Sequence, residues 1–245
     1  MPNTTTIEDK IIIALDVGTK AEALALAIEL PEARVFKVGM ELFTAEGPAL
    51  IEEVAGLGKK AFLDLKYHDI PNTAAGAVRS AVRLGVHMLT LHASGGREML
   101  RRAVEAARSE ADSTGRPRPI LLGVTVLTSL KDEQLREVGC ASPVSEQVLR
   151  LARLAGEAGV DGVVCSPHEI EVIKRELGRE FLVVTPGIRP AWAATQDQKR
   201  VMTPAEAVLR GADYMVIGRP VTGAPSPRDA FALIVRELEQ DSPLS

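Results

Sequence analysis

The sequence predicts a (β/α)8 barrel, and three observations support that fold class. Eight short apolar segments rich in β-branched residues alternate with amphipathic segments rich in Ala, Leu, Glu and Arg. Strands that alternate with helices form βαβ units and a parallel sheet. The length of 245 residues suits eight such units, and no linker interrupts the chain. We therefore expect a single domain over residues 1–245, with frayed tails at 1–9 and 241–245.

Each expected strand is followed by a segment that can be helical. In chain order, the strands are expected at residues 11–15, 34–38, 60–65, 87–91, 120–126, 162–165, 181–185 and 214–218. Gly85, Gly159 and Gly211 stand where a helical segment passes into the next strand, so we expect left-handed helix C-caps there. A doubly wound sheet is the alternative, but it normally uses fewer strands, and no GxGxxG follows the first strand.

Composition narrows the classes of partner. The net charge of −4 argues against a broad nucleic-acid or anionic-membrane surface, and the 3% of aromatic residues argues against stacking on bases. No apolar run approaches the roughly 18 residues of a membrane span. The polar N-terminus lacks a signal-peptide core, and the two cysteines form no disulfide framework. We expect a cytoplasmic protein that binds neither nucleic acid nor membrane.

Unusual polar residues gather where the expected strands end, which is where barrels of this class place their active sites. Asp16 follows the first strand, Lys37 lies near the end of the second, and Thr128 follows the fifth. Asp64 and Lys66 end the third strand and, being two residues apart, should face the same side. A lysine beside carboxylates stays protonated, which suits a fixed cation or proton donor better than a Schiff-base nucleophile. The alternative is a strand-end salt bridge, which Lys37 on the neighbouring strand makes less attractive.

A second group of residues suits an anion. The sequences PGIR (186–189) and IGRP (217–220) follow the seventh and eighth strands and supply Arg189 and Arg219. Glycine lets backbone N–H groups approach an anion, arginine matches phosphate geometry, and these two loops often bind phosphate in barrels. Solvated loop arginines are the alternative. The four histidines have no HxH or HExxH spacing, so no metal site is expected. Trp192 fits a core position and a ligand-covering loop about equally well.

These residues spell a known pattern. DLKYHDIPNT (64–73) closely resembles the DxKxxDIPxT signature of the orotidine 5′-monophosphate decarboxylase family. Six further segments are similar to the family's in order and spacing: LDVG (15–18), FKVGMELF (36–43), VTVLTS (124–129), TPGIRP (185–190), DQKRVMTP (197–204) and IGRP (217–220). The resemblance covers almost the whole chain.

The resemblance implies a reaction and a mechanism. Orotidine 5′-phosphate would lose CO2 to give uridine 5′-phosphate, the last step of pyrimidine nucleotide synthesis, with neither metal nor cofactor. Catalysis would be largely electrostatic, because the carbanion at pyrimidine C6 has no evident electron sink. Lys66 would stabilise that carbanion and deliver the proton, and Asp64 would lie near the substrate carboxylate. Lys37 and Asp69 would complete the charged array.

The resemblance also implies which residues bind the substrate. Asp16 and Lys37 would contact ribose hydroxyls, and Thr128 would contact the pyrimidine. Phosphate would be held by Arg189, Arg219 and the backbone of Gly218, with Gln198 bridging phosphate and base from a lid at 188–200. In the family, the second Asp of the signature serves the other subunit, so Asp69, Ile70 and Thr73 would reach the partner's site in a homodimer.

Two rival interpretations stay open. Sugar-phosphate decarboxylases and aldolases of the wider superfamily share DxKxxD but use Mg²⁺, and both Lys37 and the IPNT extension disfavour them. A non-catalytic nucleotide- or phosphate-binding barrel would need the arginines and Gln198 but not the array of lysines and aspartates.

Overall fold

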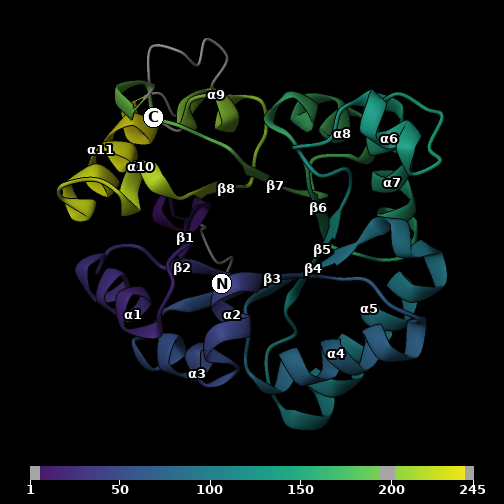
Figure 1. The fold of residues 1–245 in the computed structure, drawn as a ribbon, viewed down its shortest axis with the longest axis horizontal. Helices are drawn as coiled ribbons and strands as arrows, with labels where there is room; N and C mark the ends of the chain where they lie inside the picture. Colours follow the sequence, from purple (N-terminus) through teal and green to yellow (C-terminus); the bar gives the residue numbers. More distant parts are fainter. Residues whose placement is uncertain (1–5, 194–201, 241–245) are drawn as a thin grey trace.

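The chain folds into a closed barrel of eight parallel strands surrounded by helices (Figure 1). The computed structural model describes residues 6–193 and 202–240. The strands pair in chain order, and β8 closes on β1. They are β1 (Ile11–Ala14), β2 (Val35–Gly39), β3 (Lys60–Tyr67), β4 (Met88–His92), β5 (Ile120–Val124), β6 (Gly162–Val164), β7 (Leu182–Pro186) and β8 (Tyr214–Ile217). The predicted fold class is therefore confirmed.

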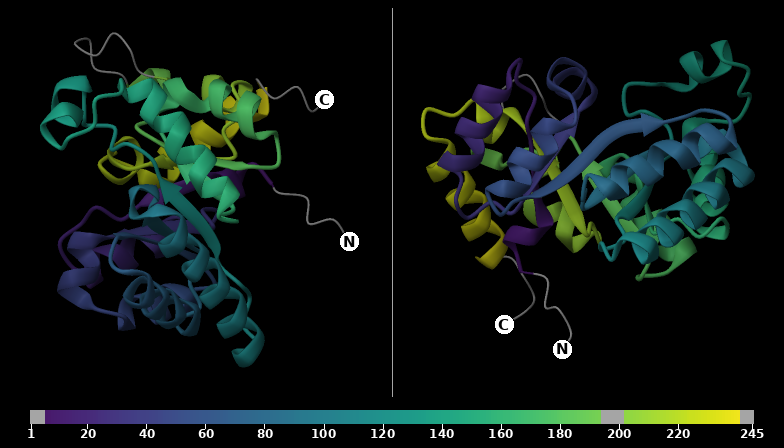
Figure 2. Two further views of the ribbon diagram at one scale, coloured as in Figure 1. Left: turned by 90° about the vertical axis from the view of Figure 1, so that its right-hand side faces the viewer. Right: turned by 90° about the horizontal axis from the view of Figure 1, so that it is seen from below.

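The helices form a layer outside the strands. They are α1 (Lys20–Glu29), α2 (Met40–Glu46), α3 (Ala49–Gly56), α4 (Pro71–Arg83), α5 (Gly96–Thr114), α6 (Asp132–Glu137), α7 (Val144–Glu157), α8 (Ile170–Leu177), α9 (Pro204–Leu209), α10 (Arg219–Thr222) and α11 (Pro227–Gln240). Gly85, Gly159 and Gly211, which precede strands β4, β6 and β8, have φ of 73°, 83° and 102°. The predicted left-handed glycines are therefore confirmed. Figure 2 shows the segment that carries α6 projecting from the body of the barrel.

Alternation along the strands divides the core into two parts. Inside the barrel, apolar side chains from seven strands pack together: Ile12, Ala14, Val35, Phe62, Met88, Leu122, Val184 and Val216. The alternate strand residues point outward and pack against the helices, as Leu63 and Leu89 do. Because Phe62 and Met88 face inward, the period of two places Asp64 and Thr90 on the inner side one step nearer the carboxyl ends.

Strand β3 departs from regular geometry where it reaches the charged residues. Its register with β4 shifts between Leu63 and Tyr67. Lys66 has a φ of 50°, and it is the only non-glycine residue with positive φ among those that the structure describes. Such backbone geometry costs free energy and is concentrated at functional sites.

Three of the predicted boundaries are wrong by two residues or more. β3 continues to Tyr67 rather than ending at residue 65, because its last residues still pair with β4. β5 ends at Val124, so that Thr128 lies in the following loop. Residues 6–9 belong to the folded body: Glu8–Lys10 form a 3-10 helix, and Asp9 pairs with Arg34 and Lys60. Residues 1–5 and 241–245 lie outside the described part of the chain.

Candidate active site

Four charged side chains form a continuous network at the carboxyl ends of β1, β2 and β3, here called the mouth cluster (Asp16, Lys37, Asp64 and Lys66). Lys66 Nζ donates to both carboxylate oxygens of Asp64, at 3.0 and 2.9 Å. Lys37 Nζ lies 3.9 Å from Asp64 Oδ2 and donates to Asp16 Oδ1 at 3.1 Å. The predicted clustering of these residues is confirmed in geometry.

The inner members of the mouth cluster are largely shielded from water. The side chains of Lys37 and Asp64 are 12% and 13% exposed, and that of Lys66 is 23% exposed, whereas Asp16 is 62% exposed. Charges in such positions interact through a lower effective dielectric than surface pairs do. The cluster is therefore preorganised before any ligand arrives.

A cavity of about 230 Å³ lies over the mouth cluster. Its charged side is formed by Lys37, Asp64 and Lys66, and Thr128 contributes a hydroxyl. The rest of its lining is apolar: Phe62, Val124, Val126, Leu127, Val164, Pro186 and Val216. This combination suits a flat heterocycle that presents a charged or reacting edge to the lysine and the aspartate. A strand-end salt bridge alone would have no need of this cavity.

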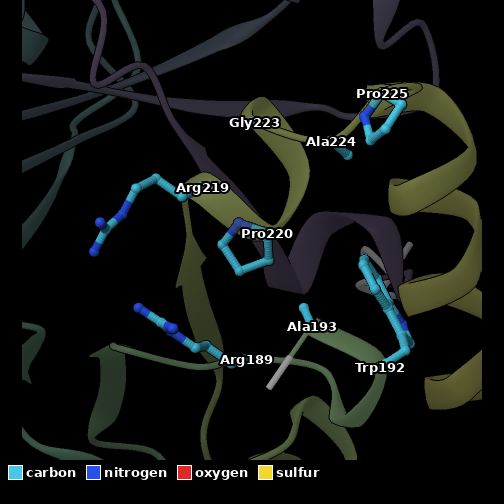
Figure 3. Close-up of a pocket in the computed structure, with 8 residues that line it drawn as sticks. All are labelled: Arg189, Trp192, Ala193, Arg219, Pro220, Gly223, Ala224 and Pro225. Carbon is cyan, nitrogen blue, oxygen red and sulfur yellow. The ribbon is translucent and has the colours of Figure 1, made fainter. Parts of the chain in front are cut away.

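A second cavity, of about 320 Å³, holds the two arginines that were predicted to bind phosphate (Figure 3). Arg189 follows β7 and Arg219 begins α10, and their side chains extend in the same direction. The backbone N–H of Arg189 donates to the carbonyl of Met202 at 3.1 Å, which fixes the start of its loop. Two guanidinium groups that point the same way have the charge and the donors that suit an anion.

Gly218 joins the two parts of the site. A Cβ at this position would lie 3.5 Å from Asp16 Oδ2 and 3.5 Å from the Cβ of Ala14. The loop that carries Arg219 is therefore packed directly beside the mouth cluster. The two cavities therefore lie on either side of the segment Gly218–Arg219, at the same end of the barrel.

Trp192 lies in the arginine cavity rather than in the core. Trp192 is 46% exposed and lines the cavity together with Pro220, Ala224 and Pro225. Figure 3 shows the indole on the side away from the two guanidinium groups. The structure thus rules out the core interpretation of this residue.

Three residues of the predicted site line neither cavity of this chain. Asp69, Ile70 and Thr73 are exposed at the start of α4, and Ile70 is 68% exposed. The Asp69 side chain makes a local contact, accepting a hydrogen bond from the Ile70 N–H at Oδ1 over 2.7 Å. Gln198 lies outside the described residues.

Two features beside Lys66 were not predicted from the sequence. Thr90, which is fully buried, bonds to both Lys66 and Asp64. The rings of His68 and His92 lie 5.4 Å apart. Burial lowers the pKa of His92, and the nearby positive charges of His68 and Lys66 lower it further. The sequence did contain a signal for both residues: alternate residues of a strand face the same side, so Thr90 and His92 face the barrel interior as Met88 does.

The described residues, 6–193 and 202–240, contain no group of three or more His, Cys, Asp or Glu residues placed to hold a metal ion. Within the same ranges, no helix has the length and apolar character needed to cross a membrane.

Comparison with known proteins gives a consistent family. Residues 9–234 match the model of the family described as "Orotidine 5'-phosphate decarboxylase / HUMPS family". A protein of Moorella thermoacetica named orotidine 5′-phosphate decarboxylase is 56% identical over 234 residues, covering 95% of this chain and 93% of that protein. One of the same name from Geobacter sulfurreducens is 53% identical over 231 residues, covering 94% and 96%. The crystal structure of orotidine 5′-phosphate decarboxylase from Lactobacillus acidophilus matches with a TM-score of 0.84 and 40% identity, covering 93% of this chain and 97% of that one.

Proposed function

The chain belongs to the orotidine 5′-phosphate decarboxylase / HUMPS family, and on that premise we propose that it converts orotidine 5′-phosphate to uridine 5′-phosphate and CO2. It is a carbon–carbon lyase of the carboxy-lyase class, and it serves pyrimidine synthesis, where this reaction completes UMP. The observation that carries the proposal is the Lys66–Asp64 pair, held in the cavity between the barrel interior and the arginines.

The chemistry follows from where the charges stand. The bond between C6 and the carboxylate carbon breaks, CO2 leaves, and the electron pair stays on C6. Lys66 stabilises this carbanion as an ammonium and then gives it a proton, forming the C6–H bond and leaving a neutral amine that regains a proton from water. Asp64, which holds Lys66 through both oxygens, lies close to the departing carboxylate. Lys37 balances the negative charge of Asp64.

Binding is divided along the length of the substrate. The pyrimidine occupies the cavity lined by Phe62, Val126 and Thr128, and Asp16 and Lys37 reach the ribose hydroxyls. Arg189, Arg219 and the Gly218 backbone hold the phosphate, and Gln198 bridges phosphate and base. Phosphate contacts far from C6 supply binding energy that organises the reacting end.

Neither metal nor cofactor takes part in this proposal. An ultraviolet assay with orotidine 5′-phosphate in the presence of EDTA tests it. Loss of substrate absorbance at an undiminished rate is expected. No turnover at micromolar enzyme would overturn the proposal, and turnover that EDTA abolishes and Mg²⁺ restores would point to the magnesium-dependent branch instead.

A homodimer completes the proposed site. Asp69, Ile70 and Thr73 are exposed and line neither cavity of their own chain, so they are accessible to a partner subunit just after β3. In a mixture of inactive Asp69→Ala and inactive Lys66→Ala subunits, some dimers carry one intact shared site. Partial recovery of activity is expected, and absence of recovery after verified subunit exchange would contradict the sharing. A cytoplasmic location and a single domain over residues 1–245 belong to the same proposal.

A further inference from the structure

The side chain of Thr90 connects the two central residues of the mouth cluster. Its Oγ1 donates to Asp64 Oδ1 at 3.0 Å and accepts from the backbone N–H of Lys66 at 2.9 Å. No other side chain in the described ranges bonds both the carboxylate of Asp64 and the backbone of Lys66. The hydroxyl thus uses both its donor and an acceptor lone pair on the same two catalytic residues.

Thr90 sits where it has little freedom to move. It is fully buried on β4, and inward alternation places it one step beyond Met88. A β-branched side chain in a strand is stiff at χ1, so its hydroxyl is aimed by the backbone. Because Thr90 is buried away from solvent, losing either hydrogen bond would leave a polar group unsatisfied, which costs free energy.

The backbone of Lys66 needs such a partner. Lys66 is in the left-handed region at φ 50°, and the register between β3 and β4 shifts around it. Even-numbered residues of β3 bond toward β2, as the Lys60 N–H does to the carbonyl of Arg34, but the Lys66 N–H turns to the other side and bonds to the Thr90 hydroxyl on β4. Strained conformations persist only where surrounding contacts hold them.

We propose that Thr90 is a positioning residue for the decarboxylation. It holds the Lys66 backbone in its left-handed conformation and fixes the orientation of the Asp64 carboxylate that grips the Lys66 ammonium. Thr90 itself does not touch the substrate. This inference rests on the proposed function, because it concerns how the proton donor is aimed at C6.

The test compares Thr90→Val, which keeps the shape and removes the hydroxyl, with Thr90→Ser, which keeps the hydroxyl. Thr185→Val is the matched control: Thr185 is also fully buried, but its hydroxyl bonds to the carbonyl of Cys165, and it lines neither cavity. For Thr90→Val, kcat should fall by about 10- to 100-fold while KM and UMP affinity change less than about threefold. Thr90→Ser should regain most of the kcat, and Thr185→Val should keep the kcat of the unmodified enzyme.

Each outcome decides the matter. If the unmodified chain decarboxylates orotidine 5′-phosphate but Thr90→Val has the same kcat as Thr185→Val, the positioning role is wrong and the proposed function stands. If the unmodified chain is inactive, the proposed function itself fails and takes this role with it. Should Thr90→Val not fold, as a melting curve would reveal, Thr90→Ala and Thr90→Ser give the same comparison. Equal kcat in those two variants would overturn the proposal.

Discussion

Each end of the barrel holds a carboxylate between two cations, and the two clusters differ in the burial of those cations and in what surrounds them. At the mouth, Asp64 lies between Lys66 and Lys37, whose side chains are 23% and 12% exposed. At the amino ends of the strands, Asp9 lies 3.1 Å from both Arg34 and Lys60, whose side chains are 50% and 45% exposed. We call Asp9, Arg34 and Lys60 the amino-end cluster.

The mouth cluster and the amino-end cluster contain similar charged groups, but their surroundings suit one to catalysis and the other to stability. The mouth cluster faces a cavity and includes a residue with a left-handed backbone. The amino-end cluster ties the 3-10 helix before β1 to the starts of β2 and β3. Ion pairs with half-exposed partners stabilise a fold by up to about 1 kcal/mol each, whereas preorganised charges in a shielded cavity can stabilise a transition state. We therefore expect activity to depend on one cluster and stability on the other.

Neutralising Asp64 gives the largest expected effect among the substitutions that break this comparison. Asp64→Asn removes the charge that holds Lys66 and leaves the shape nearly unchanged, so kcat should fall by about 10³-fold or more. Steady-state decarboxylation kinetics with a melting curve measure it. A decrease of less than tenfold in a folded variant would argue that the mouth cluster is not the catalytic one.

Removing Arg219 tests the other end of the same site. Arg219→Ala deletes one of two guanidinium groups that face the proposed phosphate, and kcat/KM for orotidine 5′-phosphate should fall by about 10- to 100-fold. Arg228→Ala is the control, since Arg228 pairs with Glu32 at the exposed surface. An equal change in the two variants would mean that Arg219 does not bind substrate.

In the amino-end cluster, an Asp→Asn substitution like that at Asp64 should lower stability rather than activity. Asp9→Asn weakens the ion pairs with Arg34 and Lys60 and leaves kcat unchanged, with a loss of about 1–2 kcal/mol in the free energy of unfolding. Chemical denaturation at fixed protein concentration provides the number. A variant with normal stability and reduced kcat would reverse the assignment of the two clusters.

His87, which lies near Lys60 and Asp9 of the amino-end cluster, should make the stability of the protein depend on pH. Burial, helped by the charge of Lys60, lowers the pKa of His87 from 6.5 to about 4. Between those values the unfolded chain binds a proton that the folded chain does not, so stability falls as pH falls through this window. At pH 5.5 the loss relative to pH 7.5 should be about 1 kcal/mol. Denaturation of His87→Gln at both pH values should lack this part of the loss, whereas the exposed control His168→Gln should keep it.

The smallest expected effect concerns the space beside Lys37. A Cβ on Gly39 would lie 3.2 Å from Lys37 Nζ, so Gly39→Ala should displace the ammonium by a few tenths of an ångström. Because a lysine end is flexible, kcat should fall by less than about tenfold. Gly56→Ala, whose Cβ would meet nothing within 4 Å, should have no effect on kcat. Equal kinetics for both variants would indicate that the Lys37 position is not finely set.

Much of this site could be predicted from the sequence because it follows simple periods. Alternation along β3 placed Asp64 and Lys66 on one face, and the barrel brought them to Lys37 and Asp16. The left-handed backbone of Lys66 could not be predicted, since no glycine marks it and it depends on the register between β3 and β4. Thr90 could not be predicted as a functional residue, because threonine is common in strands and nothing in the sequence shows that it lies beside Lys66. The tail was predicted too long because Asp9 finds its partners 25 and 51 residues away.

The central claim is that Lys66 donates the proton to C6. The most direct test compares Lys66→Ala with Lys60→Ala, since each variant loses one lysine ammonium, at opposite ends of β3. Decarboxylation of orotidine 5′-phosphate is followed in both variants, together with UMP binding as a check of the folded site. We predict no detectable turnover but retained UMP binding for Lys66→Ala, and the kcat of the unmodified chain for Lys60→Ala. Substantial turnover by a folded Lys66→Ala variant would contradict the account.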